Sequence, residues 1–177
     1  MLLKDINRYL NFEGKKPGPR EMFYLIFTQG VWATVVYRFG SWNRRHKIPV
    51  LSMFLGLVYF FLNKSVEISA GISISCNARI GGGLYIGHFG QIIVHPDVIM
   101  GENCNIGQGI TIGTAGVGKT GAPVIGNNVY IGTGAKVLGR ITIGNNVRIG
   151  ANAVVIKDIP DNATAVGVPA KVVKTRG

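Results

Sequence analysis

Aliphatic residues recur at every sixth position through most of the second part of the chain. The residue two places before the repeated one is often apolar as well, and glycine often follows it. A period of six matches neither the 3.6-residue period of an α-helix nor the two-residue alternation of a simple strand. Repeats of a short fixed period are typical of solenoids. The fourteen repeated positions form three runs separated by two interruptions, and they are Ile68, Ile74, Ile80, Ile86, Val94, Met100, Ile106, Ile112, Ile125, Ile131, Val137, Ile143, Ile149 and Val155.

This repeat predicts a left-handed parallel β-helix of hexapeptide repeats over residues 66–170. Each hexad supplies a short strand and a turn, with the aliphatic side chain inside and glycine or asparagine in the turn. Three faces close a coil of about 18 residues, so the hexads predict about four to five coils. Neighbouring coils share ladder hydrogen bonds and core, so no coil is stable alone. A glycine-rich sandwich or a disordered repeat is the alternative, and the regular phase of the aliphatic residues argues against both.

Residues 1–65 have a different composition. They contain ten Lys and Arg against three acidic residues, which accounts for +7 of the formal net charge of +11. Two apolar blocks, 22–40 and 48–62, flank a basic run at 44–47. Both blocks are long enough for helices, but the second is shorter than the roughly 20 residues that span a bilayer. We expect a helical segment that either contacts an anionic membrane surface or packs its two helices together at one end of an oligomer.

Composition also bears on the class of protein and its location. Hydrophobic residues make up 47% of the chain, which favours a packed core over disorder. Cys76 and Cys104 are too few for a disulfide framework, and we expect both to be small core residues. Residues 1–20 lack the apolar core of a secretory signal, so we expect a cytoplasmic location, at the inner face of the cytoplasmic membrane if residues 1–65 bind lipid. The long apolar runs suit lipid or helix packing better than nucleic acid.

The second interruption, residues 113–124, contains a sequence that mimics a phosphate-binding loop. Residues 113–120 match the pattern GxxxxGK[ST]. That motif holds phosphate only where a helix follows a strand, whereas here the hexads resume soon after Pro123. We therefore expect a loop that leaves the β-helix, whose backbone amides and Lys119 are available to an anionic ligand.

The first interruption reads Gly87-His88-Phe89-Gly90. Solenoids carry function on their insertions, and the near-neutral pKa typical of histidine suits a general base. His88 lies between glycines that let a ligand approach, so we predict that it is the catalytic base. His95 is a weaker candidate for contact with substrate. The sequence contains no Ser-His-Asp or metal-ligand spacing, so no metal is predicted.

Residues 74–173 resemble the serine acetyltransferase branch of the hexapeptide acyltransferases. The resemblance rests on NARIGGGLYIGHFGQIIV (77–94), NCNIGQGITIG (103–113) and the run from VIGNNVYIGTGAKVLG to AVGVPAKVV (124–173). It implies a homotrimer with acetyl-CoA in the groove between subunits, and a histidine base where His88 stands. The ending AVGVPAKVV is similar to the segment that closes the coenzyme site in this family.

The chain departs from that family around the acceptor. The serine enzymes have an aspartate where Gly87 stands, and a second aspartate, which pairs with the histidine, where Ser73 stands. Their loop carries an Arg-His pair that is absent from residues 119–123 here. Glu67, six residues before Ser73, is a candidate substitute for the missing partner. We therefore expect a closer likeness to members that acetylate sugars in surface-polysaccharide biosynthesis, with a small-molecule or lipid-linked saccharide as acceptor.

The functional hypothesis is an acetyl-CoA-dependent O-acetyltransferase that acts on a saccharide hydroxyl. The alternatives are a serine O-acetyltransferase of cysteine biosynthesis and a non-catalytic trimeric scaffold. His88 would take the acceptor proton, a backbone amide near Thr114 or Thr133 would stabilise the oxyanion, and cations would line the channel of the anionic coenzyme. The candidate coenzyme contacts are Thr114, Thr133, Ala135, Lys136, Arg148, Ala151, Lys157 and Lys171. The weaker candidates for substrate contact are Glu67, Ser73, Gly87, His95 and Lys119. Residues 171–177 are expected to form a C-terminal tail.

Overall fold

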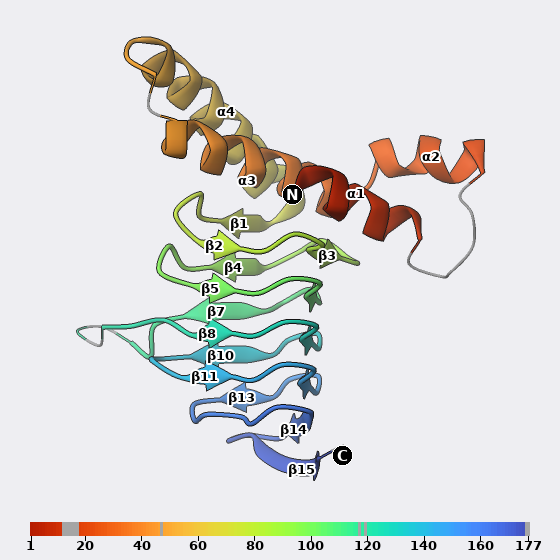
Figure 1. Cartoon of the computed structure of the whole chain (residues 1–177), viewed down its shortest axis with the longest axis vertical. Helices are drawn as coiled ribbons and strands as arrows, with labels where there is room; N and C mark the ends of the chain where they lie inside the picture. Colours follow the sequence, from red (N-terminus) through yellow and green to blue (C-terminus); the bar gives the residue numbers. More distant parts are fainter. Residues whose placement is uncertain (12–17, 47, 117, 119, 176–177) are drawn as a thin grey trace.

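The computed structural model describes all residues except 12–17, 47, 117, 119 and 176–177. It consists of a β-helix with a group of helices at one end (Figure 1). We call these helices the helical cap, and they are α1 (Leu2–Leu10), α2 (Pro19–Ile26), α3 (Gln29–His46) and α4 (Leu51–Ala70). The strands that follow are β1 (Ile72–Ile74), β2 (Arg79–Ile80), β3 (Tyr85–Ile86), β4 (Ile92–Val94), β5 (Ile99–Met100), β6 (Asn105–Ile106), β7 (Thr111–Gly113), β8 (Val124–Ile125), β9 (Tyr130–Ile131), β10 (Lys136–Leu138), β11 (Thr142–Ile143), β12 (Arg148–Ile149), β13 (Val154–Val155), β14 (Ala163–Val166) and β15 (Lys171–Thr175).

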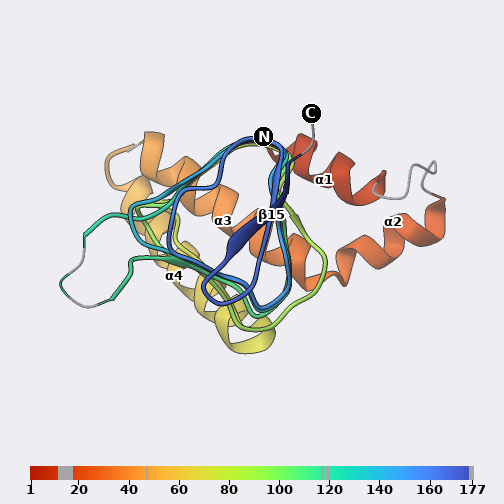
Figure 2. The ribbon, with the colours of Figure 1, turned by 90° about the horizontal axis from the view of Figure 1, so that it is seen from below.

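The strands form three faces around a triangular cross-section (Figure 2). Face A consists of β1, β4, β7, β10 and β13, face B of β2, β5, β8 and β11, and face C of β3, β6, β9, β12, β14 and β15. Strands from successive coils pair in parallel, as β1 pairs with β4. The five strands of face A correspond to about five coils. The predicted β-helix of hexapeptide repeats is confirmed.

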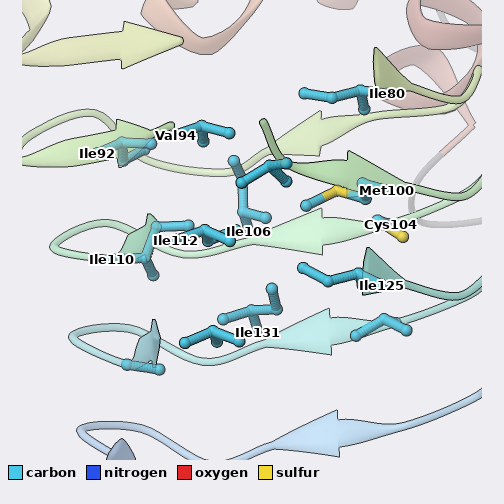
Figure 3. Packing of buried hydrophobic residues seen from close by; sticks show 14 of the residues in the cluster. Ile80, Ile92, Val94, Met100, Cys104, Ile106, Ile110, Ile112, Ile125 and Ile131 are labelled. Carbon is cyan, nitrogen blue, oxygen red and sulfur yellow. The ribbon is translucent and has the colours of Figure 1, made fainter. Parts of the chain in front are cut away.

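The repeated aliphatic residues form the core, as Figure 3 shows for part of it. The predicted residues two places earlier are buried too, from Ile92 at 0% exposed to Ile141 at 9%. Ile68 is the exception, because it is 86% exposed on α4, so the first predicted hexad is wrong. The helical period applies there: Val66 and Ala70 are buried, and Ile68 lies on the opposite side of the helix. The other thirteen positions are at most 3% exposed, and they are Ile74, Ile80, Ile86, Val94, Met100, Ile106, Ile112, Ile125, Ile131, Val137, Ile143, Ile149 and Val155.

The two ends of the β-helix are closed differently from what the sequence predicted. The expected tail at 171–177 contains strand β15, which pairs antiparallel with β14. At the other end the helical segment continues to Ala70, so the expected boundary at residue 65 falls inside α4. The first apolar block is divided between α2 and α3, and residues 51–62 of the second lie in α4.

A buried ion pair joins the helical cap to the first coil. Arg38 on α3 donates to both carboxylate oxygens of Asp5 on α1, at 2.8 and 3.0 Å. Asp5 also accepts from the backbone amides of Gly83 and Leu84, at 2.7 and 2.9 Å. Arg38 donates in turn to the carbonyls of Ile80 and Gly81, both at 2.6 Å. The first coil has no coil before it, so this ion pair supplies hydrogen-bond partners for its amides and carbonyls that a preceding coil would otherwise supply.

Two tyrosines complete this closure. The Tyr37 hydroxyl donates to the carbonyl of Ala78 at 2.9 Å and accepts from the amide of Ile80 at 3.1 Å. The Tyr9 hydroxyl likewise donates to the carbonyl of Ile86 at 3.4 Å and accepts from the amide of Ile86 at 2.9 Å. Burial raises the pKa of Tyr9 to about 12, so this hydroxyl keeps its proton at neutral pH and can donate.

α3 and α4 form an antiparallel hairpin. Gly40 lies against the ring of Tyr59, and a Cβ atom at this position would overlap that ring. Asn43 also donates from its side chain to the carbonyl of Ser52, at 3.1 Å. The two apolar blocks therefore pack on each other within one chain. Among the described residues, α4 alone is long and apolar enough to cross a membrane, on length and composition.

Candidate active site

The His88 turn lies where the first coil passes from face C to face A, directly beneath the helical cap. The amide of Gly90 donates to the carbonyl of Ala70 at the end of α4, at 2.8 Å. The carbonyl of Gly90 accepts from the amide of Gly109 in the next coil, also at 2.8 Å. His88 itself is exposed. The turn is thus fixed between the cap and the second coil while its imidazole side chain remains open to a ligand.

A cavity of about 480 Å³ lies on the outer side of face A, and its lining includes Gln91, the residue that follows this turn, but not His88. Its floor follows the strand register, in which Ser73 pairs with Ile93, Ile93 with Thr111, and Thr111 with Lys136. Glu67 reaches the cavity from α4. The structure therefore brings three predicted site residues, Glu67, Ser73 and Lys136, together in one cavity.

Glu67 is an ionised group at the wall of this cavity. Its carboxylate accepts from the Ser73 hydroxyl at 2.8 Å, from the Asn63 amide at 2.9 Å and from the Lys64 ammonium at 2.5 Å. Burial alone would raise the pKa of Glu67, but the hydrogen bonds from Lys64, Ser73 and Asn63 together lower it below its ordinary value. The Lys136 ammonium donates to the carbonyl of Gly109, so the cavity contains one anion and one cation in fixed positions.

Gln91 also lines the cavity and was not predicted as a site residue. Its φ of 52° is left-handed. In the following coils the equivalent positions are Gly109, Gly134 and Asn152, with φ of 72°, 73° and 55°. Glycine and asparagine adopt this conformation readily, whereas other residues pay for it. A glutamine that keeps this backbone conformation beside a cavity points to a functional constraint. The signal was present in the sequence, because the register places Gln91 in a glycine position.

Gln108 is a second residue that the sequence did not single out. It lies at the corner between faces C and A in the second coil, one coil from the His88 turn. Its Oε1 is the one buried side-chain oxygen or nitrogen without a hydrogen-bond partner among the described residues. Such atoms are rare and call for an explanation. We interpret this oxygen as an acceptor for a donor group on a bound molecule.

Five of the remaining predicted residues lie along the two edges of face A. Thr133 and Ala151 are at the corner between faces C and A, in the third and fourth coils. Thr133 is two strand spacings from the His88 turn, which is about 10 Å along the axis. His95, Thr114 and Lys157 are at the opposite edge, between faces A and B. The His95 ring accepts from the amide of Asp97 at 3.2 Å, which is a local structural role.

Some predicted residues are not part of this arrangement. Arg148 is exposed on face C, and Lys171 is exposed on β15. Ala135 was predicted to contact the coenzyme, but its side chain is fully buried and its amide and carbonyl are bonded to Gly132 and Thr111. The side chain of Ala135 therefore faces the core. Lys119 lies outside the described residues. Gly87 is beside Tyr85, whose ring would be 3.3 Å from a Cβ atom there.

The loop after β7 differs from a phosphate-binding loop. β7 ends at Gly113 and β8 begins at Val124, and no helix occurs among the described residues between them. The loop projects from the corner between faces A and B (Figures 1 and 2). Its last part contributes to the core, because Ala122 is only 7% exposed.

The two cysteines have different environments. Cys104 is fully buried in the core, as predicted, and burial raises the pKa of its thiol to about 11. Cys76 is only partly buried and lies outside the core cluster, so the prediction for Cys76 is wrong. It falls in the turn between β1 and β2. Within the described part of the chain, no group of three or more His, Cys, Asp or Glu could hold a metal ion.

Residues 122–157 match the family described as "Bacterial transferase hexapeptide (six repeats)". Curated relatives include the serine acetyltransferase of Synechococcus elongatus, 38% identical over 156 residues, which are 86% of this chain and 60% of the relative. The serine acetyltransferase of Escherichia coli K12 is 34% identical over 152 residues, 84% of this chain and 52% of the relative. This chain thus spans between about half and two thirds of the length of these relatives.

Solved structures extend the likeness to almost the whole chain. Serine acetyltransferase from Brucella abortus strain S19, in complex with coenzyme A, has a TM-score of 0.83 and 28% identity over 99% of this chain and 67% of that one. The Neisseria gonorrhoeae enzyme in complex with serine has a TM-score of 0.77 and 29% identity over 98% and 67% of the two chains.

The repeat, the three-faced coil and these relatives support a place for the chain among the hexapeptide-repeat acyltransferases. The relatives reported above are named serine acetyltransferases. They favour the serine branch over the expected closer likeness to members that acetylate polysaccharides.

Proposed function

We propose that this chain transfers an acetyl group from acetyl-CoA to a hydroxyl group. One observation carries the proposal: 99% of the chain superposes on a serine acetyltransferase solved with coenzyme A. The exposed histidine at the break in the first coil and the cavity beside it supply the chemistry. Both features argue against a non-catalytic scaffold.

In the proposed reaction, His88 takes the proton from the acceptor hydroxyl. The oxygen attacks the thioester carbonyl, and a backbone amide stabilises the oxyanion that forms. The C–S bond then breaks, the ester remains on the acceptor, and the thiolate of coenzyme A takes the proton from His88. Protons and electrons balance within the two substrates and the imidazole.

The coenzyme would lie along an edge of face A, where Lys136 and Lys157 offer positive charge to its phosphates. Four of the predicted coenzyme residues occupy the two edges of that face within one chain. A homotrimer would bring the edge that carries Thr133 and Ala151 next to the opposite edge of a neighbour, which carries Thr114 and Lys157. We therefore propose a trimer with three equivalent grooves. Sedimentation equilibrium tests this, and a monomer that is fully active would contradict it.

Serine is the acceptor that the names of the relatives support, so it is the first candidate. A saccharide is the second candidate, and specific residues favour it. Gly87 and Ser73 stand where the resemblance leads us to expect carboxylates, and the carboxylate of Glu67 is already bonded to Ser73. Gln91 and Gln108 add neutral hydrogen-bonding groups, which suit a polyhydroxyl compound.

The decisive experiment measures release of the coenzyme A thiol together with the mass of the acetylated product. Acetyl-CoA is supplied with serine, free sugars, nucleotide sugars or lipid-linked saccharides in parallel reactions. Saturable acetylation of serine establishes the first candidate, and acetylation of a saccharide alone establishes the second. If no acceptor raises thiol release above the rate with acetyl-CoA alone, while a related serine acetyltransferase is active in the same assay, the proposed transferase activity is wrong.

A further inference from the structure

α3 has two sides of opposite character. Its inner side carries Tyr37 and Arg38, which bond to the first coil. At 100° per residue, Trp32 lies on the opposite side, while Val35 and Trp42 lie on the flank of the helix next to Arg38. They are 39%, 38% and 45% exposed. α3 thus exposes two tryptophans, Trp32 on the side remote from the first coil and Trp42 on the flank.

The tip of the α3–α4 hairpin and α2 add to this apolar surface. Figure 1 shows both at the end of the molecule that is remote from β15. Large apolar side chains are more than half exposed there, a pattern that marks interaction surfaces when they are contiguous. We define the outer surface of the cap as Trp32, Val35 and Trp42 together with Phe23, Ile26, Phe27, Val50, Met53 and Phe54.

Positive charge borders this surface. Arg44 and Arg45 are exposed in the last turn of α3, next to the hairpin tip. Among the residues of the cap whose side chains the structure describes, the acidic ones are Asp5 and Glu67, and they form ion pairs with Arg38 and Lys64. The outer surface therefore combines exposed aromatic and aliphatic groups with cations at its edge.

A second cavity opens on the same side of α3. It has a volume of about 420 Å³, and its walls include Val35, Phe39 and Trp42. Met1, Leu2, Arg38, Ser41, Arg45 and His46 complete its lining. An apolar cavity with cationic groups in its lining fits a molecule with an acyl chain and an anionic head.

We propose that the outer surface of the cap binds an anionic lipid bilayer. Tryptophan favours the level of the headgroups, and basic residues next to an anionic leaflet strengthen binding. Contact with the surface is proposed rather than a span, because one side of α4 packs against α3 and the first coil. The bond between Gly90 and Ala70 holds the His88 turn against the cap, at the end of α4 opposite the hairpin tip.

Flotation of the full chain with vesicles tests this proposal. The vesicles are mixtures of phosphatidylglycerol and phosphatidylcholine, and phosphatidylcholine alone serves as the uncharged reference. The charge variant is Arg44→Glu with Arg45→Glu. Its matched control is Arg79→Glu with Lys174→Glu, which changes the net charge equally at exposed positions on the β-helix. An apolar variant, Val50→Asp with Met53→Asp, changes side chains that are 80% and 78% exposed, so folding should be preserved.

The full chain should float with the anionic vesicles at low salt. Each basic residue near such a surface is worth roughly 5-fold in binding, so the charge variant should lose about 25-fold or more, while the control should bind like the unmodified chain. The apolar variant should also lose binding to the anionic vesicles. A chain that stays at the bottom of the gradient overturns the proposal, as does an equal loss in the control. If the apolar variant floats normally but changes the oligomeric state, the surface is an interface between copies instead.

Discussion

The β-helix and the helical cap satisfy their backbone groups in opposite ways. Within the β-helix each coil bonds to the next, as when the amide of Gly107 donates to the carbonyl of Ile131 and the amide of Gly132 to that of Ile149. The first coil has no coil before it, so individual side chains of the cap, above all Asp5 and Arg38, take that place. A repeated backbone pattern tolerates many sequences, whereas a closure built from single side chains depends on each of them.

The candidate site lies at the junction of these two regions. The His88 turn belongs to the β-helix, but α4 holds it through Ala70, and the same helix supplies Glu67 to the cavity. Catalysis should therefore depend on both regions, while stability should depend most sharply on the contacts of the cap. Substitutions on either side of the junction can test this division.

The largest effect is expected for Asp5→Ala. The change leaves Arg38 buried without its partner and removes the acceptor of the Gly83 and Leu84 amides, so it should cost about 3–5 kcal/mol in the free energy of unfolding. Urea unfolding followed by circular dichroism measures this cost. The matched control is Glu102→Ala, since the Lys4–Glu102 pair is 46% and 54% exposed and should contribute about 1 kcal/mol or less. Equal losses in both variants would show that the cap closes the coil less specifically than the buried contacts indicate.

His88→Ala should lower turnover by on the order of 10²-fold or more. The side chain is exposed, so the urea midpoint and the binding of coenzyme A should not change. Steady-state rates with the acceptor identified above provide the measurement. His46→Ala, at the far end of α3, is the matched control and should retain full activity with a soluble acceptor. A His88 variant within threefold of the unmodified rate would remove this residue from the mechanism.

The difference between the regions also explains what the sequence could predict. Residues such as Ile131 and Ile149 repeat with the period of the backbone, so their burial follows from spacing alone. The ladder of Ser73, Ile93 and Thr111 follows too, once the first interruption is counted. The partner of Asp5 could not be predicted, because Arg38 is 33 residues away and Gly83 is 78 residues away and no period relates them. Ile68 matched the hexad phase by coincidence, and the acceptor was ranked as a saccharide above the serine that the relatives favour.

Gln108→Leu is expected to have a moderate effect that separates binding from folding. Its Oε1 lacks a partner, so removing it should not destabilise the chain. The unfolding midpoint of the variant should therefore equal that of the unmodified chain. If a bound acceptor donates to this oxygen, the variant should raise the acceptor KM by roughly 10-fold, the value of one hydrogen bond in a buried site. A lower midpoint with an unchanged KM would show instead that the oxygen has a structural role.

The smallest effect is expected for Gln91→Gly, and it should have opposite signs in stability and in function. Glycine adopts the left-handed conformation of this position without strain, although it gains freedom in the unfolded chain, so a net increase of about 0.5–1 kcal/mol in the free energy of unfolding is expected. The acceptor KM should rise, because the variant loses the amide that lines the cavity. Asn152→Gly is the matched control, since it occupies the equivalent turn position in the fourth coil with a φ of 55°, away from the cavity. Asparagine tolerates that conformation, so the control should gain little stability and keep its KM. If the Gln91 variant is stabilised but its KM is unchanged, the cavity does not hold the acceptor. If the variant is destabilised, the glutamine side chain supports the fold of the junction itself.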